Sequence, residues 1–208
     1  DHNNVGVRSQ ACRDRRPVSD LHTAVRDATA RLEAAGIRSP EADAVELAAF
    51  ALDTDAGDVR RAMVLRTVPD ARFVATFEAL VGERLTRVPL QHLTGRAHFR
   101  RLTLAVGPGV FVPRPETEVT AGLAIDAASE VGEGVVVVDL CTGSGAIALA
   151  VKDELPGATV LAVELSDLAH GWAVANRDRL GFDVDVRLGD ATTAFDDPVG
   201  RVDVVVSN

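Results

Sequence analysis

The stretch Val135-Val-Val-Val-Asp139-Leu-Cys-Thr-Gly143-Ser-Gly145 decides the fold of this protein. Its consecutive valines predict a buried strand, its glycines predict a loop, and a helix is expected over Ala146–Glu154. In such a unit, backbone N–H groups and the positive end of the helix face a ligand that approaches too closely for side chains. The stretch therefore predicts a binding loop for a nucleotide-type cofactor. A dinucleotide also fits, because the pattern G-x-G-x-x-G/A runs from Gly143 to Ala148.

Predicted strands and helices alternate along the C-terminal half of the chain. Strands that alternate with helical stretches of about ten residues form a parallel sheet in an α/β domain. We therefore predict such a domain over residues 115–208. Its predicted strands are Val135–Asp139, Thr159–Val163, Val184–Leu188 and Val202–Val206, and its predicted helices are Thr117–Ser129, Ala146–Glu154 and Asp167–Leu180.

Residues 18–88 have a helical periodicity instead. Their apolar spacing predicts helices that pack as a small bundle. The last of these helices is expected to bury Phe73, Phe77 and Leu80 and to end near Arg87. The predicted helix starts are Ser19 or Asp20, Ser39-Pro40-Glu41, a point near Asp58, and Asp70.

Residues 89–114 are expected to link the two domains. Apolar residues alternate between Phe99 and Val106, the turn residues Gly107-Pro108-Gly109 follow, and Val110-Phe111-Val112 is apolar again. This pattern predicts a β-hairpin or strand pair that turns at the glycines. Residues 1–17 show no apolar periodicity and predict a flexible tail.

The charge balance excludes a generic polyanion binder. The chain has 31 acidic and 22 basic residues, for a net charge of −9, and nucleic-acid affinity rests mainly on excess cations. No apolar run is long enough to cross a bilayer and no secretory segment opens the chain, so we expect a cytoplasmic protein. Cys12 and Cys141 have no disulfide-framework or metal-type spacing, so we expect two thiols and no metal site.

Carboxylates are predicted at the ends of successive strands. Glu164 can accept hydrogen bonds from both hydroxyls of a ribose. Asp139 would repel a pyrophosphate but attract a sulfonium or amino group. Asp190 can accept a hydrogen bond from the exocyclic amine of adenine. Together these acids predict a nucleoside with a cationic centre, which is S-adenosylmethionine.

Several stretches together closely resemble the HemK/PrmC family over about residues 19–208. They are Pro89-Leu-Gln-His-Leu-Thr-Gly95, Val112-Pro-Arg-Pro-Glu-Thr-Glu118, Asp139-Leu-Cys-Thr-Gly-Ser-Gly-Ala-Ile-Ala148 and Val205-Val-Ser-Asn208. Family members methylate the side-chain amide of the glutamine in the Gly-Gly-Gln loop of peptide chain release factors. The resemblance implies a Rossmann-like methyltransferase domain that uses S-adenosylmethionine, an N-terminal helical domain that recognises the substrate, and a release factor as partner. We expect a monomer that contacts no nucleic acid and no membrane directly.

The resemblance also implies roles for single residues. Asn208 matches the first residue of the catalytic Asn-Pro-Pro-Tyr motif, whose acceptors hold the N–H groups of the glutamine amide. Cys141 stands where the family usually has glycine, and Ala191 where it often has a large aromatic residue. The implied cofactor-binding residues are Asp139, Cys141, Thr142, Gly143, Ser144, Gly145, Glu164, Asp190, Ala191 and Asn208, and the implied cleft-lining residues are Arg114, Pro115, Glu116, Thr117 and Asn208.

Some alternatives stay open at this point. The sequence stops at the first residue of the catalytic motif, so we expect a portion of a longer protein whose further strands complete the sheet. Nucleic-acid exocyclic-amine methylation and non-catalytic cofactor binding remain as other functions. Residues 84–114 contain six arginines and no acid. This segment either faces an acidic release factor or pairs with nearby acids, and Arg114 and Glu116 either edge the cleft or cap the next helix.

Overall fold

The chain divides into two compact units, residues 1–90 and residues 91–208, in a computed structural model that describes residues 19–195 and 201–208. The predicted tail over residues 1–17 lies outside the described residues. Within the described ranges, no helix is both long enough and apolar enough to cross a membrane.

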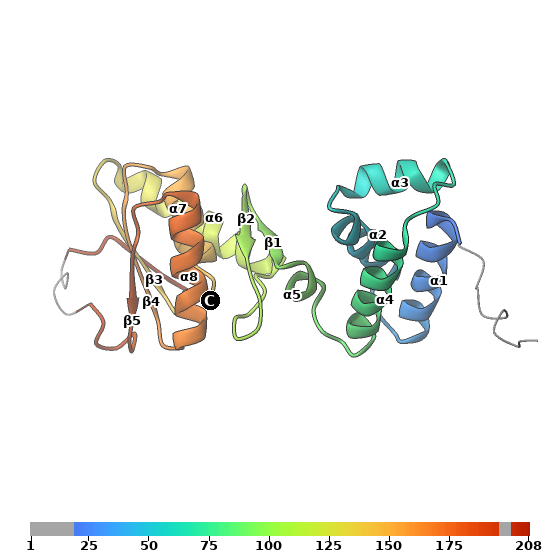
Figure 1. The fold of residues 1–208 in the computed structure, drawn as a ribbon. Coiled ribbons are helices and arrows are strands. Elements are labelled where there is room, and N and C mark those ends of the chain that lie inside the picture. The colour runs from blue at the N-terminus through green and yellow to red at the C-terminus, as the bar shows by residue number, and fades with distance from the viewer. Residues whose placement is uncertain (1–18, 196–200) are drawn as a thin grey trace, which may run out of the picture. The chain divides into compact units, whose positions relative to one another are not determined.

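The first unit is a bundle of helices (Figure 1). Asp20, Asp55 and Asp70 each cap a helix, because their side chains accept a hydrogen bond from a backbone N–H in the first turn. The predicted starts are thereby confirmed to within two residues. The helices are α1 (Leu21–Ala34), α2 (Pro40–Leu52), α3 (Ala56–Val64) and α4 (Ala71–Leu85).

The core of the first unit contains two of the three residues that the sequence predicts to be buried in its last helix. Phe73 and Phe77 of α4 are buried and stack with ring centroids 5.1 Å apart. Val81 completes that buried face, whereas Leu80 is only partly buried. Positions 73, 77 and 81 recur every four residues, so at 3.6 residues per turn the buried stripe shifts gradually around the helix as it runs toward the C-terminal end of α4.

The boundary between the two units falls within α5 (Leu90–Thr94), and the second unit continues with an antiparallel hairpin of β1 (Arg96–Phe99) and β2 (Leu102–Ala105). The predicted turn position is wrong. The chain reverses at positions 100 and 101, where Phe99 pairs with Leu102, and Gly107 and Gly109 lie in the loop beyond β2. The physical reason is burial, because this register sends alternate apolar side chains of both strands into the core of the unit.

A parallel sheet with strand order β5-β4-β3-β6 forms the centre of the second unit. Since β3, β4 and β5 follow one another in one direction across the sheet, crossovers of one hand place α7 and α8 on the same face (Figure 1). The α/β prediction is confirmed. The strands are β3 (Val136–Leu140), β4 (Thr159–Glu164), β5 (Asp185–Leu188) and β6 (Val204–Ser207), and the helices are α6 (Pro115–Val131), α7 (Ala146–Glu154) and α8 (Asp167–Leu180).

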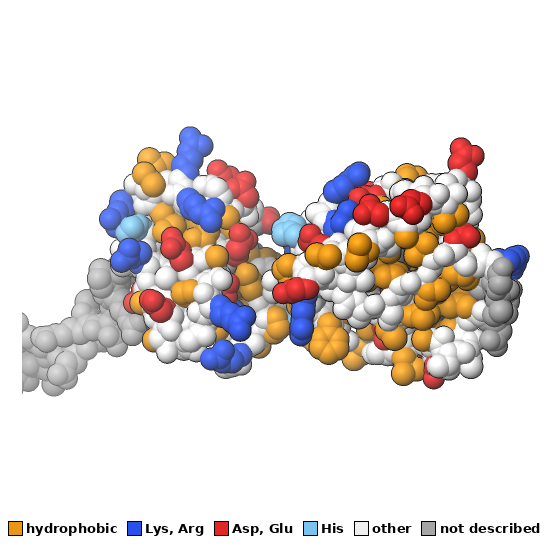
Figure 2. Space-filling view, turned by 180° about the vertical axis from the view of Figure 1, so that it is seen from behind, with side chains coloured by type: hydrophobic (Ala, Val, Ile, Leu, Met, Phe, Trp, Pro, Cys, Tyr) orange, Lys and Arg blue, Asp and Glu red, His pale blue; other side chains and the backbone are white. Residues whose placement is uncertain are grey.

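Hydrophobic side chains also reach the surface of the second unit. Figure 2 shows a broad hydrophobic area on the unit that lies at the right of that view. Residues of this unit with large exposed apolar side chains are Phe111, Val119, Leu123, Val131, Leu165, Leu168, Leu188 and Val205.

The hairpin arginines pair with acids of their own unit. The guanidinium of Arg100 makes two hydrogen bonds with the carboxylate of Glu154, at 2.6 and 2.9 Å, and Arg101 lies 3.2 Å from Asp153. The hydrogen bond from Arg100 lowers the pKa of Glu154 below its usual value. The backbone N–H of Arg100 also donates to Glu118. These contacts favour the structural reading of these two arginines over a role in docking the substrate.

Candidate active site

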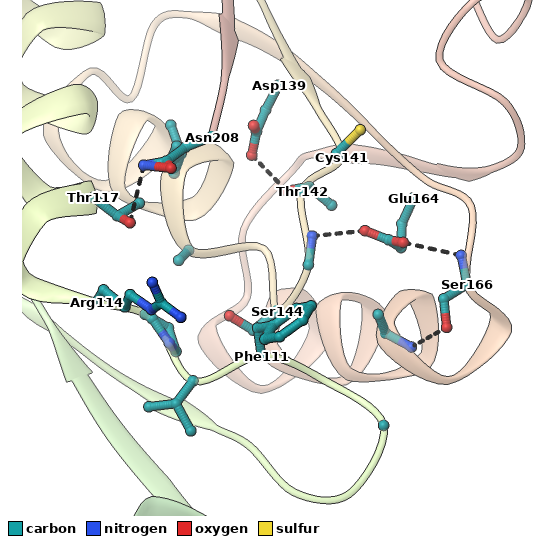
Figure 3. A pocket seen from close by; sticks show the side chains of 17 residues that line it. Phe111, Arg114, Thr117, Asp139, Cys141, Thr142, Ser144, Glu164, Ser166 and Asn208 are labelled. Atoms are coloured by element: carbon teal, nitrogen blue, oxygen red, sulfur yellow. Dashed lines mark hydrogen bonds between the residues drawn. The ribbon is translucent and has the colours of Figure 1, made fainter.

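A cavity of about 550 Å³ lies where the carboxyl ends of β3, β4 and β6 meet (Figure 3). Ligands of open parallel sheets bind at this edge, and the volume falls in the range of ordinary ligand pockets. The predicted site residues that line it are Arg114, Thr117, Asp139, Cys141, Thr142, Gly143, Ser144, Glu164 and Asn208. The predicted residues that are not among its lining residues are Pro115, Glu116, Gly145, Asp190 and Ala191.

The glycine loop is a tight turn between β3 and α7. Cys141, Gly143 and Gly145 all have positive φ angles, of 62°, 59° and 84°. The N–H of Thr142 donates to Val163 O at 3.0 Å, and this bond ties the loop to β4. A left-handed backbone conformation costs free energy in residues that carry a Cβ. This explains why the family usually has glycine at position 141, and it means that Cys141 is strained there.

Replacing Cys141 by glycine is expected to raise the free energy of unfolding by about 1 kcal/mol, because glycine adopts the left-handed region without a steric penalty. Urea-induced unfolding measures the change. The matched control is Cys141→Ala, which removes the thiol but keeps a Cβ at φ 62° and should leave stability near wild type. Equal stabilisation by both substitutions would instead assign the effect to the thiol.

The carboxylate of Glu164 is held by two backbone donors. One oxygen accepts from the N–H of Gly143 and the other from the N–H of Ser166, both at 2.9 Å (Figure 3). A carboxylate oxygen can accept more than one hydrogen bond, so each oxygen retains acceptor capacity toward the cavity. Ser166 in turn caps α8 through its hydroxyl. Glu164 therefore links the glycine loop to the start of α8 and presents a fixed acceptor pair.

Asp139 is a buried acid at the end of β3, with a side chain that is 1% exposed. Its Oδ2 accepts hydrogen bonds from the hydroxyl of Thr142 at 2.5 Å and from the N–H of Ala148 at 3.1 Å. Burial nevertheless raises the pKa of Asp139 to about 7, and the nearby charge of Glu164 adds to the rise. A cation in the cavity would stabilise the charged form of this acid.

The raised pKa predicts how stability depends on pH. The ordinary pKa of Asp139 is 3.8, so between pH 3.8 and about 7 the folded protein keeps a proton that the unfolded chain has lost. The contribution of Asp139 to the free energy of unfolding is therefore fully present below pH 3.8 and is lost as the pH rises through about 7.

Denaturant unfolding of wild type and Asp139→Asn at about pH 5 and about pH 9 tests this, because asparagine does not titrate. We expect wild type to lose stability relative to the variant at the higher pH. A difference that stays constant with pH would contradict the raised pKa.

Asn208 follows β6 and reaches the same cavity from the opposite side. Its Nδ2 donates to the hydroxyl of Thr117 on α6 at 3.0 Å (Figure 3). The same nitrogen lies 3.5 Å from the hydroxyl of Thr120, also on α6. The donation fixes the nitrogen side of the amide. The carbonyl oxygen Oδ1 thus becomes the acceptor that the Asn208 amide can offer a ligand.

Asp190 makes its own turn beyond β5. Its Oδ1 accepts from the N–H and the hydroxyl of Thr192, at 2.8 and 2.7 Å, and these bonds lower the pKa of Asp190. The carboxylate is therefore charged at neutral pH, and its Oδ1 is engaged in local hydrogen bonds. Asp190 and Ala191 are absent from the cavity lining, and their cofactor-binding role stays a prediction.

Sequence reasoning missed part of the cavity wall. Phe111 lines the cavity and its side chain is 88% exposed, although the alternation pattern suggested a paired strand there. Ser166 and Ala169 line it from the N-terminal end of α8. The neighbouring Pro113-Arg114-Pro115 was the available signal for Phe111, because prolines disfavour a paired strand.

Comparisons with known proteins match the chain in two parts. The PrmC N-terminal domain matches residues 23–95, and the methyltransferase small domain matches residues 101–208. Three proteins named release factor glutamine methyltransferase are similar to this chain. They come from Streptomyces coelicolor (55% identical, covering 88% of this chain and 63% of that protein), Mycolicibacterium smegmatis (47%, covering 90% and 65%) and Corynebacterium glutamicum (44%, covering 90% and 66%). The chain thus spans just under two thirds of the length of these relatives.

Proposed function

The chain belongs to the HemK/PrmC family of methyltransferases, and from that premise we propose that it transfers a methyl group from S-adenosylmethionine to the side-chain amide nitrogen of the Gly-Gly-Gln glutamine of release factors. One observation supports this proposal above the others. A single cavity brings together the glycine loop, the acceptor pair of Glu164 and the amide of Asn208.

The residues around the cavity suit the proposed cofactor. S-adenosylmethionine, when bound, supplies an electrophilic methyl group on a sulfonium. Glu164 offers acceptors for ribose hydroxyls, because each of its oxygens keeps a free lone pair. Asp139 and Glu164 make this edge of the sheet acidic, which favours a cationic ligand. Gly143 has open space above its Cα, so backbone can approach a ligand closely there.

Asn208 has the chemistry to bind a glutamine amide. The lone pair of an amide nitrogen is delocalised into its carbonyl, so the nitrogen is a weak nucleophile and gains from precise orientation. Thr117 holds the nitrogen of the Asn208 amide, which leaves Oδ1 to accept an N–H of the substrate amide. Such an acceptor also stabilises the positive charge that develops on the substrate nitrogen as it gains a methyl group.

A methylation assay with radiolabelled S-adenosylmethionine tests the proposal on the full-length protein. Label is expected in a release factor and absent from the same factor with its Gly-Gly-Gln glutamine replaced by alanine. Label in both factors would contradict glutamine as the target, and label in neither would contradict the proposed function. Label in DNA or RNA would support nucleic-acid methylation instead.

A further inference from the structure

One face of α8 holds the chain segment of residues 105–112, which we call the wall segment because Gly109, Phe111 and Val112 line the cavity. Asn176 is fully buried on this face. Its Oδ1 accepts from the N–H of Ala105 at 2.7 Å, and its Nδ2 donates to Ala105 O at 2.9 Å. Asn176 therefore binds the start of the wall segment as a neighbouring strand would.

The same Asn176 side chain also reaches the glycine loop. Its Nδ2 donates to the carbonyl oxygen of Ser144 at 3.0 Å, and Ser144 lines the cavity. Arg179, less than one turn further along α8, donates to Oδ1 of Asn176 at 3.3 Å and to the carbonyl of Thr103. A single buried amide thus connects the wall segment and the glycine loop, which bound the cavity from two sides.

Trp172, one turn before Asn176, holds the middle of the wall segment. Its indole N–H donates to Pro108 O at 3.2 Å. The indole packs so closely that only glycine fits at position 107, because a Cβ there would lie 2.5 Å from the ring. A Cβ on Gly109 would similarly lie 2.7 Å from the side chain of Leu168. The two glycines therefore bring the wall segment directly against α8.

We propose that Trp172 and Asn176 are positioning residues, which hold the wall segment and the glycine loop at the spacing that the cofactor requires. The inference rests on the proposed function, since it takes the cavity to be the cofactor site. If the wall segment is already ordered before the cofactor binds, the free energy of binding does not have to include the conformational entropy lost in ordering it. Loosening this face should then weaken cofactor binding and leave turnover at saturating cofactor nearly unchanged.

The test uses Gly107→Ala in the full-length protein, because glycine is required at position 107 only to leave space for Trp172. Gly107 has no positive φ, so alanine introduces a contact with Trp172 without backbone strain. Gly171→Ala is the matched control, since a Cβ on this neighbour of Trp172 meets nothing within 4 Å. Calorimetric titration with S-adenosylmethionine is expected to show a dissociation constant about tenfold higher for Gly107→Ala and unchanged for Gly171→Ala.

A double substitution separates positioning from general damage. In a Trp172→Ala background, adding Gly107→Ala is expected to cause no further loss of affinity, because the ring it would strike is gone. Asn176→Asp keeps one acceptor oxygen but loses the donor to Ala105 and Ser144, and should weaken binding to a similar extent. Trp172 is the only tryptophan among these 208 residues, so a cofactor-dependent emission change that Trp172→Phe abolishes would report directly on this contact.

The outcomes distinguish the two proposals. If the wild-type protein binds S-adenosylmethionine and Gly107→Ala binds it with the same affinity, the positioning role alone is overturned. The same holds if the affinity losses of Trp172→Ala and Gly107→Ala add in the double variant. Failure of the wild-type protein to bind S-adenosylmethionine would overturn the proposed function and the positioning role with it. An affinity loss in Gly107→Ala that the control Gly171→Ala does not share, with KM for cofactor raised and kcat retained, supports both.

Discussion

Replacing Asn208 by alanine is expected to lower kcat for glutamine methylation by about 10²- to 10³-fold, the usual cost of removing a hydrogen bond that stabilises developing charge. The structural reason is the orientation of the Asn208 amide, which Thr117 holds by its nitrogen. Cofactor affinity should change less than kcat, because Glu164 and the glycine loop remain. Steady-state kinetics with release factor and a separate binding titration measure the two effects.

Variants of α6 provide the matched comparison. Thr117→Val removes the hydroxyl that orients the Asn208 amide and should lower kcat by about tenfold, the worth of one neutral hydrogen bond. Thr120→Val should have a smaller effect, since its hydroxyl lies 3.5 Å from the same nitrogen. If Asn208→Ala methylated release factor at the wild-type rate, Asn208 would have no catalytic role.

Replacing Glu164 by alanine is expected to raise the dissociation constant for S-adenosylmethionine by about 100-fold, or about 3 kcal/mol, which corresponds to two hydrogen bonds to a charged group. The substitution removes the proposed ribose acceptors. It also frees the N–H groups of Gly143 and Ser166, which fix the glycine loop and the start of α8. Isothermal titration calorimetry with the full-length protein measures the change.

Two further variants define the origin of that loss. Glu164→Gln keeps one acceptor oxygen, so its affinity should lie between those of wild type and the alanine variant. Asp178→Asn removes an exposed acid near the C-terminal end of α8, where it pairs with Arg177, and should leave affinity unchanged. Equal losses in Asp178→Asn and Glu164→Ala would show that overall acidity, and not the acceptor pair, governs binding.

The regular elements could be predicted from the sequence because their signals are local. The bounds of α7 and α8 agree with the predicted ranges, since apolar periodicity and capping residues lie within each helix. The position of the hairpin turn could not be predicted from the sequence, because the local pattern favours a turn at Gly107-Pro108-Gly109. Arg100 instead adopts a φ of 50° in the turn and is held by Glu118 and Glu154, which are distant in the sequence.

In the candidate site, too, some residues could be placed from local sequence signals and others depend on contacts that the sequence does not show. Asp139, residues 141–144 and Glu164 could be placed together because the carboxyl ends of parallel strands meet at one edge. Asp190 also follows a strand, but its carboxylate accepts hydrogen bonds from Thr192. The spacing of the residues does not show that Thr192 competes with a ligand for this carboxylate. The roles of Trp172 and Asn176 depend on contacts with residues 64 and 71 positions away, so no local pattern predicts them.

The register of β6 bears on how the protein folds as it is synthesised. Ser207 of β6 bonds to Leu140 of β3 across 67 residues, whereas the helices of the first unit pack mostly against near neighbours in sequence. Contacts between distant segments form slowly, and N-terminal units generally fold first during synthesis. The helical unit should therefore be complete on the ribosome while the β3–β6 pairing is still to come. Asn208 would then join the glycine loop and Glu164 late, so the cavity would form only after all 208 residues of this sequence had emerged.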